Sequence, residues 1–401
     1  MSESKKNSVG VLVVLLGLFM TLGPAGVDSF VPAIKFIAAD FGVETHLVEL
    51  TLPAIFFGNA FGNIFFGPLS DRFGRRPVML TTISVWTTMA VLGAFVPNVE
   101  TLIVLRFVQG FAASAGRIVG PAAGRDSYER EHLRRLLTYS MLIATTSPIV
   151  SSPLGGYLAS NFGWRASFAY MSVVGCVTLL MFIFVFKETI AKRDLNAIRP
   201  RNLFGSFREI LKNTVFLRYL IFAALLASGM SNFLTSSSGV LIGQYGLSPV
   251  TYGLLFATIM IGFLVASLIA GRLVARLTIN TMITASAAFA ATGGIAMTVL
   301  AHMGIYTPAA IVVPMMIYTA GFGLGTAQAV AGAITPFPHK AGTASSLMGF
   351  LQSSFSAGTA TVVASFADGT PVPMSTGIAF SGIGALLAAL AILFIWPKSE
   401  N

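Results

Sequence analysis

Twelve apolar segments, each about as long as the hydrocarbon core of a bilayer, follow one another along this sequence. A helix needs about 20 apolar residues to cross that core. Only 10% of the 401 residues are charged and 55% are hydrophobic, whereas about a quarter are charged in soluble domains. We therefore predict an all-α membrane protein whose twelve transmembrane helices lie near residues 9–33, 47–68, 78–96, 101–124, 136–159, 164–186, 217–240, 248–270, 278–302, 306–328, 341–366 and 374–396.

A polar stretch in the middle of the chain divides these spans into two sets of six. We expect a linker over 187–216, with a short amphipathic helix, between an N-terminal six-helix bundle (1–186) and a C-terminal one (217–401). A faint repeat agrees with this division, because the Gly, Leu and Arg of GPLSDRF (67–73) recur at the same spacing in GRLVARL (271–277). Paired six-helix repeats are a known transporter architecture.

The basic residues predict the orientation of the chain in the membrane. With a cytoplasmic N-terminus, all Lys and Arg except Lys35, Arg106, Arg117 and Arg165 lie on the cytoplasmic side or in the linker. Such a bias keeps basic loops inside, so we expect both termini in the cytoplasm of a bacterium, with the chain in the inner membrane. The formal net charge of +10 then reflects topology and not nucleic-acid binding. The N-terminal apolar run has no small-residue cleavage site, so we expect a retained helix.

Several classes of function lack their sequence signals. A single cysteine, Cys176, excludes an internal disulfide, and four scattered histidines give no zinc-ligand spacing. Neither the phosphate-binding G-x-x-x-x-G-K-[ST] nor the nucleophile motif G-x-S-x-G occurs. We expect no enzyme, no metal and no cofactor, and a proton gradient as the energy source.

The most specific motif is GPLSDRFGRRPV (67–78), between the second and third spans. Its glycines permit tight turns, and its aspartate is one anion among three arginines. A loop that only obeyed the positive-inside bias would need the arginines alone. We expect this loop to control conformational change and not to touch substrate, through Gly67, Asp71, Arg72, Gly74, Arg75 and Arg76.

This loop resembles the signature loop of the major facilitator superfamily. LRFVQGFAA (105–113) is similar to the superfamily's fourth-helix motif, with Arg106, Gln109 and Gly110 in place. SPIVSSPLGG (147–156) resembles the fifth-helix motif associated with antiporters, although Ser152–Pro153 stands where that motif has Gly–Pro. The resemblance implies two pseudo-symmetric bundles, and close helix contact and gating at Pro148, Pro153, Gly155 and Gly156.

Finer features resemble the bicyclomycin/chloramphenicol-resistance (Bcr/CflA) branch of drug:proton antiporters. They are D-x-x-x-P in the first span (Asp28, Pro32), R-D-x-Y after the fourth (Arg125, Asp126, Tyr128), and P-x-x-A-G-T-A-S-S-L from Pro338 to Leu347. The resemblance implies drug export by alternating access, and we assign Arg125 and Asp126 to the gating group.

Asp28 is an acid inside the first span, where a carboxylate is costly and usually functional. No Asp or Glu lies between Glu209 and Asp368, and Glu49 lies near a helix end. Asp28 is thus the leading candidate for proton coupling. The alternative is a permanently paired residue that shapes the helix.

Arg106 lies at a depth similar to that of Asp28, and Arg117 follows it eleven residues later on nearly the same helix face. If both arginines line one cavity with Asp28, the three charges sum to +1. That sum favours neutral, zwitterionic or anionic substrates. The alternative is that Arg117 only snorkels toward the cytoplasm.

Other polar groups within the spans are weaker cavity candidates, each of which could equally be a packing residue. They are Asn59, Gln109, Asn232, Tyr318 and Gln352, with Phe30 and Phe233 as an apolar wall.

Together these features predict a secondary active transporter, expected as a monomer, that exports small, partly hydrophobic compounds in exchange for protons. Its partners would be the substrate, protons and the bilayer, with no nucleic acid. The alternative is an uptake carrier for a metabolite or siderophore-like solute, since a fold does not set direction or substrate. A membrane enzyme or a receptor without transport has less support in the sequence.

Overall fold

The computed structural model describes residues 8–191, 193–194 and 200–394, and these residues form helices without any strand. The chain ends and part of the predicted linker, residues 192 and 195–199, lie outside the described residues. Each of the twelve predicted spans coincides with a long helix or with two helices separated by a short break, which confirms the predicted fold class.

The first six spans comprise α1 and α2 joined by a short 3-10 turn, α3 with α4, α5, α6 with α7, α8, and α9. Their bounds are α1 Val9–Asp28, η1 Val31–Ala33, α2 Ile34–Phe41, α3 Thr45–Glu49, α4 Thr51–Phe73, α5 Arg75–Gly93, α6 Val99–Ala113, α7 Ala115–Ser127, α8 Arg130–Phe162 and α9 Arg165–Phe184.

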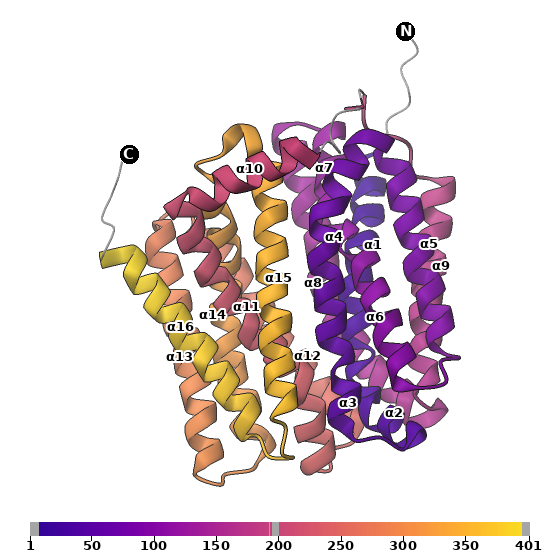
Figure 1. Cartoon of the computed structure of the whole chain (residues 1–401), viewed down its shortest axis with the longest axis vertical. Helices are drawn as coiled ribbons and strands as arrows, with labels where there is room; N and C mark the ends of the chain where they lie inside the picture. Colours follow the sequence, from indigo (N-terminus) through magenta and orange to yellow (C-terminus); the bar gives the residue numbers. More distant parts are fainter. Residues whose placement is uncertain (1–7, 192, 195–199, 395–401) are drawn as a thin grey trace.

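The rest of the chain begins with a linker helix, and the first of its six spans ends in a π-helical turn. The bounds are α10 Pro200–Lys212, α11 Thr214–Ser238, η2 Gly239–Gln244, α12 Pro249–Leu273, α13 Ile279–His302, α14 Pro308–Ile334, η3 Pro338–Lys340, α15 Ala341–Ser365 and α16 Val372–Phe394. The linker helix α10 packs against α11 and α15 (Figure 1).

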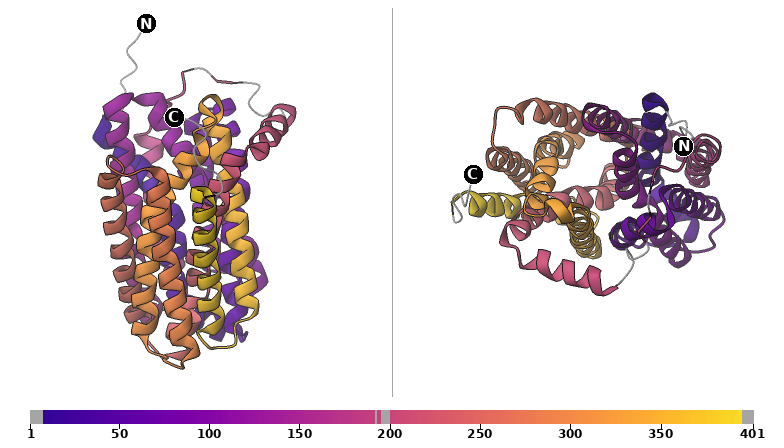
Figure 2. Two further views of the ribbon diagram at one scale, coloured as in Figure 1. Left: turned by 90° about the vertical axis from the view of Figure 1, so that its left-hand side faces the viewer. Right: turned by 90° about the horizontal axis from the view of Figure 1, so that it is seen from above.

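The two sets of six helices lie side by side (Figures 1 and 2). Within the sets, α4 packs on α6, α1 on α8, and α13 on α14 and α16. The most extensive contacts between the sets are those of α8 with α12 and of α4 with α15. The first and last described residues and α10 lie at one end of the molecule, whereas α2 and α3 lie at the other (Figure 1).

Nine helical stretches within the described residues are long and apolar enough to cross a membrane. Helices α5, α8 and α15 are not among them, because they are rich in Ser, Thr and Gly or begin with charged residues. All three contact several neighbouring helices, so their polar residues have places to pack away from lipid.

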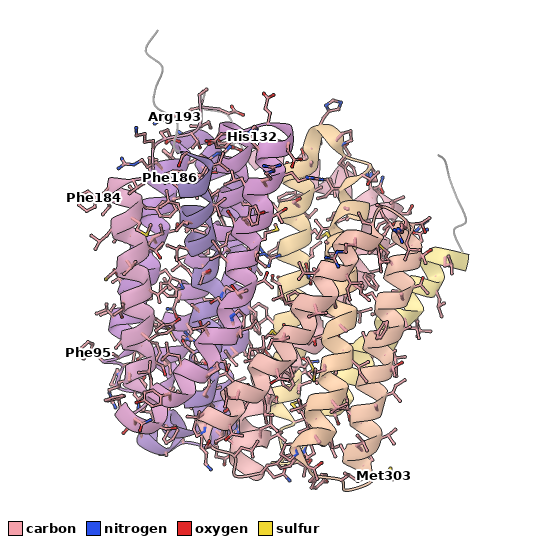
Figure 3. The ribbon with its side chains drawn as sticks, turned by 180° about the vertical axis from the view of Figure 1, so that it is seen from behind. Phe95, His132, Phe184, Phe186, Arg193 and Met303 are labelled. Carbon is pink, nitrogen blue, oxygen red and sulfur yellow. The ribbon has the colours of Figure 1, made fainter. Side chains whose placement is uncertain are left out.

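Large apolar side chains cover the outside of the helix bundle. Phe95 and Phe184 are 78% and 81% exposed, and both point away from the helices in Figure 3. Such a surface is costly in water and favourable in lipid, as expected for a multi-pass membrane protein.

The first span is broken directly after Asp28. Pro32 has no N–H to donate to the Asp28 carbonyl, and Ser29 and Phe30 form a turn before η1. The D-x-x-x-P motif therefore produces a local break, which places the Asp28 side chain at the end of α1 and not in the middle of a helix.

Candidate functional site

Asp28 is buried, with 5% of its surface exposed. Its Oδ2 atom has no hydrogen-bond partner among the described residues, and no ion pair involves it. The Tyr252 hydroxyl of α12, in the second set of helices, lies within electrostatic reach of this carboxylate. Asp28 is therefore an unpaired acid near the boundary between the two sets.

Arg106 is fully buried but does not pair with Asp28. Its guanidinium donates to the Gly26 carbonyl (2.8 Å) and to Oε1 of Gln109 (2.7 Å). It also lies over the Phe30 ring, 3.9 Å from the centroid. Gly26 is among the last four residues of α1, whose carbonyls lack helical donors. The break in α1 thus provides the acceptor that holds the arginine.

Arg117 differs from this arrangement, because it is exposed. The fourth span is interrupted between α6 and α7 at Ser114, so Arg106 and Arg117 belong to separate helices. Neither of the two pockets described below is lined by Asp28, Arg106 or Arg117. The shared cavity of these three groups, and the substrate charge class that rests on it, stay predictions.

The weaker cavity candidates are mostly satisfied by neighbouring helices. The Tyr318 hydroxyl donates to the Leu226 carbonyl (2.8 Å), and the Phe233 ring stacks on Phe256 at 6.3 Å. Gln352 donates to the Ala223 carbonyl at 3.4 Å. These contacts favour packing within the helix bundle over contact with a ligand.

The two asparagine candidates have different surroundings. Asn59 accepts a hydrogen bond from Asn63 at 3.3 Å, a contact along the same helix. Asn232 is buried, and its Oδ1 has no partner among the described residues. Of the weaker candidates, Asn232 alone therefore keeps a buried, unsatisfied polar atom.

The 67–78 loop forms an ion-pair network centred on Arg75, which is 7% exposed. Arg75 donates to Asp71 (2.6 Å), to Ser70 (2.6 Å) and to Asp126 at the end of α7 (2.8 Å). The two motifs predicted to gate therefore meet at one guanidinium. Arg72 and Arg125 are exposed.

The segment that follows α9, with Phe186 and Glu188, also binds the two arginines that begin α5. Both oxygens of Glu188 accept backbone N–H bonds, from Arg75 (3.0 Å) and Arg76 (3.2 Å). Arg76 in turn donates to the Phe186 carbonyl at 2.8 Å. Gly74 has φ +107°, a conformation that side chains with a Cβ rarely adopt, and this turn directs the two N–H groups at Glu188.

The fifth-helix motif brings α8 close to helices on two sides. A Cβ on Gly155 would clash with the Ser29 carbonyl, and a Cβ on Gly156 would clash with the Pro249 carbonyl of α12. Adjacent glycines thus allow close contact with the first span and with the second set of helices. The structure shows the close packing predicted for Gly155 and Gly156.

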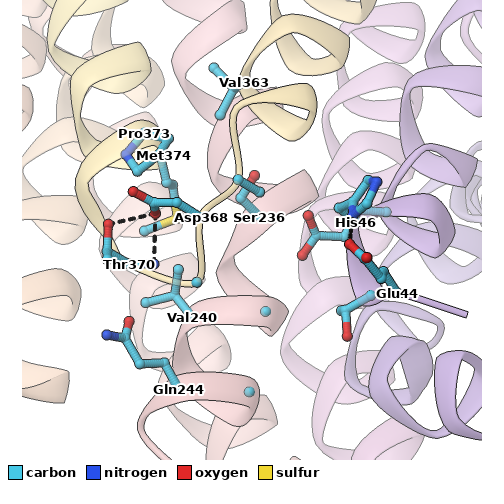
Figure 4. A pocket seen from close by; sticks show the side chains of 16 residues that line it. Glu44, His46, Ser236, Val240, Gln244, Val363, Asp368, Thr370, Pro373 and Met374 are labelled. Atoms are coloured by element: carbon cyan, nitrogen blue, oxygen red, sulfur yellow. Dashed lines mark hydrogen bonds and ion pairs between the residues drawn. The ribbon is translucent and has the colours of Figure 1, made fainter.

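A pocket of about 560 Å³ opens between the two sets of helices, at the end opposite the chain termini. Figure 4 shows Glu44 and His46 on one side and Asp368 and Thr370 on the other. None of the residues predicted for the site lines this pocket. A second cavity, of about 10 Å³ beside Gln109, has room for about one water molecule.

Glu49 is the functional candidate that sequence reasoning missed. It lines the 560 Å³ pocket and is 2% exposed. Its carboxylate accepts the backbone N–H of Gly239 from η2, while its Oε2 has no partner among the described residues. In the sequence it lies near a helix end, outside the middle of the span, and is therefore not a candidate for proton coupling. The packing of α3 against α11 and α15, with Gly239 of η2 beside the carboxylate, buries it.

The family model of the Major Facilitator Superfamily matches residues 10–361. The chain is 29% identical to the "Bicyclomycin resistance protein homolog" of Haemophilus influenzae over 99% of this chain and 98% of that protein. It is 28% identical to "Multidrug resistance protein D" of Escherichia coli, with 98% and 96% coverage. These relatives confirm the resemblance to the bicyclomycin/chloramphenicol-resistance branch.

A solved D-xylose-proton symporter has the same fold, with a TM-score of 0.76, 15% identity and 98% coverage of both chains. The matched family and the curated relatives are transporters and not enzymes, which confirms that part of the prediction. The chain belongs to the Major Facilitator Superfamily and is a multi-pass inner-membrane transporter.

Proposed function

We propose that this transporter exports small, partly hydrophobic compounds in exchange for protons. Support for export comes from the relatives, which are named as a bicyclomycin resistance protein homolog and a multidrug resistance protein. Resistance requires lower drug inside the cell, which favours export over the uptake of a metabolite or siderophore-like solute.

Asp28 is the group we assign to proton coupling. The observation that carries this assignment is its unpaired, buried carboxylate at the break of α1, within reach of Tyr252 across the boundary between the helix sets. A charge there has no counter-ion among the described residues, so binding a proton removes the cost of burying that charge. A movement of the sets that admits water would lower the cost of releasing that proton.

In the proposed cycle, the bundles 1–186 and 217–401 move relative to each other about the α8–α12 and α4–α15 contacts. Both chain termini face the cytoplasm, in agreement with the distribution of Lys and Arg. The Arg75 network, with Asp71 and Asp126, controls the cytoplasmic end, and the exposed Arg125 stays a predicted member of the gating group. Protonation changes transport only if the proton binds the two states with different affinities.

The test is substrate-driven proton flux in proteoliposomes, with bicyclomycin as the first compound of a panel. We expect Asp28→Asn to abolish the flux that wild type shows. The matched control is Asp40→Asn, which changes an exposed acid of the same span that pairs with Arg165 (2.9 Å). Coupled flux in the Asp28→Asn protein would show that the proton binds at another residue and would overturn this assignment.

The direction of transport is tested separately in cells. Expressing cells should accumulate less of the compound than knockout cells if the protein exports it. Greater accumulation in expressing cells would establish uptake and overturn the export proposal.

A further inference from the structure

We propose that the 560 Å³ pocket binds an organic cation, a protonated amine on an apolar body, with Glu49 as its buried counter-ion. This site is separate from Asp28, which does not line the pocket. The proposal concerns equilibrium binding and does not depend on proton coupling or on the direction of transport.

Glu49 lines the pocket, and its carboxylate lacks part of the hydrogen bonding that a buried charge needs. The Gly239 N–H donates to its carboxylate, and no cation lies within ion-pair distance among the described residues. The other oxygen, Oε2, is buried and has no hydrogen-bond partner in the part of the chain that the structure describes. A buried carboxylate is stable only when it is paired and hydrogen-bonded. A ligand ammonium can supply both the charge and the missing donor.

The charged side chains that line the pocket are mainly negative. Its lining contains three carboxylates, Glu44, Glu49 and Asp368, and no Lys or Arg. His46 is paired with Glu44 at 3.0 Å. Lys35 lies nearby on α2, but it donates to the Ile242 carbonyl at 3.4 Å and does not line the pocket. Low-dielectric walls lined by one sign of charge concentrate ions of the opposite sign.

Two hydrogen bonds favour the charged form of Asp368, which lines the pocket. Its carboxylate accepts hydrogen bonds from the Thr370 hydroxyl (2.7 Å) and the Thr370 backbone N–H (2.8 Å). These bonds hold the pKa of Asp368 below its ordinary value, because they stabilise the charged form. Figure 4 shows both bonds at the side of the pocket formed by the second set of helices.

The walls of the pocket suit an organic body and not a bare metal ion. Val240, Val363, Pro373 and Met374 provide apolar surface, and Ser236 adds a hydroxyl without a partner among the described residues. The volume is within the range of small-molecule sites, about 300–1,000 Å³. No group of three His, Cys, Asp or Glu within the described residues could hold a metal ion.

The test is isothermal titration of the purified full-length protein in neutral detergent. The probe is 4-phenylbutylammonium, and the matched neutral compound is 4-phenylbutanol. We expect Glu49→Gln to weaken binding of the ammonium at least about tenfold, the effect of a lost charge-assisted contact of about 1.5–3 kcal/mol. Binding of the alcohol should stay weak and unchanged.

Glu44→Gln is the matched control, because its side chain is 81% exposed and its charge is screened by solvent. We expect it to weaken ammonium binding about threefold or less. Equal affinity of wild type for the ammonium and the alcohol would overturn the proposal, as would unchanged ammonium affinity in Glu49→Gln.

A second variant keeps the test decisive if Glu49→Gln does not fold. Gly243 lines the pocket and has open space where a Cβ would lie, so Gly243→Lys would place an ammonium inside it. We expect this variant to lose binding of the probe, and full binding would contradict the site. Asp28→Asn should bind the probe normally, which separates failure of this proposal from failure of the proton-coupling proposal.

Discussion

Arg106 shows how a charged side chain is accommodated within the helices without an acid beside it. Its partners are a carbonyl at the end of α1, the amide oxygen of Gln109 and the face of Phe30. Arg disperses its charge over a planar group with five donors, which suits several weak partners better than one strong one. This buried guanidinium is therefore satisfied by a backbone carbonyl, a side-chain amide and an aromatic ring, without an acid.

We expect Arg106→Leu to lower the free energy of unfolding by about 1–3 kcal/mol, because the Gly26 carbonyl would lose its donor inside the protein. The measurement is the unfolding transition of the purified protein in detergent. Arg165→Leu is the control, since that exposed arginine pairs with Asp40 and should cost about 0–1 kcal/mol. A variant as stable as wild type would show that Gly26 needs no donor.

Arg75 and Arg72 are three residues apart and allow a direct comparison. Arg75→Ala removes the donor shared by Asp71 and Asp126, so we expect transport to fall about tenfold, equivalent to one charge-assisted bond. Arg72 is exposed, with the Phe73 ring 5.4 Å away, and Arg72→Ala should change transport about twofold or less. Initial rates in proteoliposomes measure both, and equal rates would remove Arg75 from the gating group.

At the scale of the helix, small residues decide which helices can approach. In α8, neighbouring glycines contact different partners, since Gly155 faces Ser29 and Gly156 faces Pro249. In α4 and α6, Gly58 and Gly110 similarly leave room for backbone of the opposite helix. Backbone atoms cannot move aside as a flexible side chain can, so these positions do not tolerate a larger residue.

We therefore expect Gly156→Ala to destabilise the protein by about 1–3 kcal/mol, the usual cost of overpacking. Gly358→Ala in α15 is the matched control, because no atom lies within 4 Å of a Cβ built there. Alanine is favoured over glycine in helices by about 1 kcal/mol, so this control should be neutral or stabilising. Unfolding transitions compare the two, and equal stabilities would mean that α8 and α12 can separate at no cost.

At the scale of the whole molecule, the two sets of helices meet along α8–α12 and α4–α15, with the 560 Å³ pocket between them. Alternating access requires contacts such as these to open and close during the cycle. The contact between Asn63 of α4 and Gly349 of α15 offers a way to test that requirement.

A Cβ built on Gly349 lies 3.6 Å from the Asn63 Cβ, within the range of about 3.5–4.5 Å found in disulfides. We expect Asn63→Cys with Gly349→Cys, in a Cys176→Ser background, to cross-link on oxidation and to lose transport. Reduction should restore the activity. The single-cysteine proteins are the controls, and full transport by the cross-linked protein would show that α4 and α15 need not separate.

The local features of this chain could be predicted from its sequence. Twelve helices follow from the lengths of the apolar segments, because a helix satisfies its own backbone in lipid. The break at Asp28–Pro32 follows from a missing N–H, and the turn at Gly74 from a φ that glycine tolerates. Each of these effects depends on residues within about one helical turn or one span.

The tertiary structure alone decided which side chains meet. Arg106 and Asp28 lie at similar depths, yet the arginine binds Gly26 and the acid stays unpaired. Glu49 lies near a helix end in the sequence, yet it is buried beside Gly239, a residue 190 positions away in the chain. These contacts depend on how each helix is rotated about its axis, how far apart the packed helices lie and where they break. A local sequence pattern does not determine these quantities.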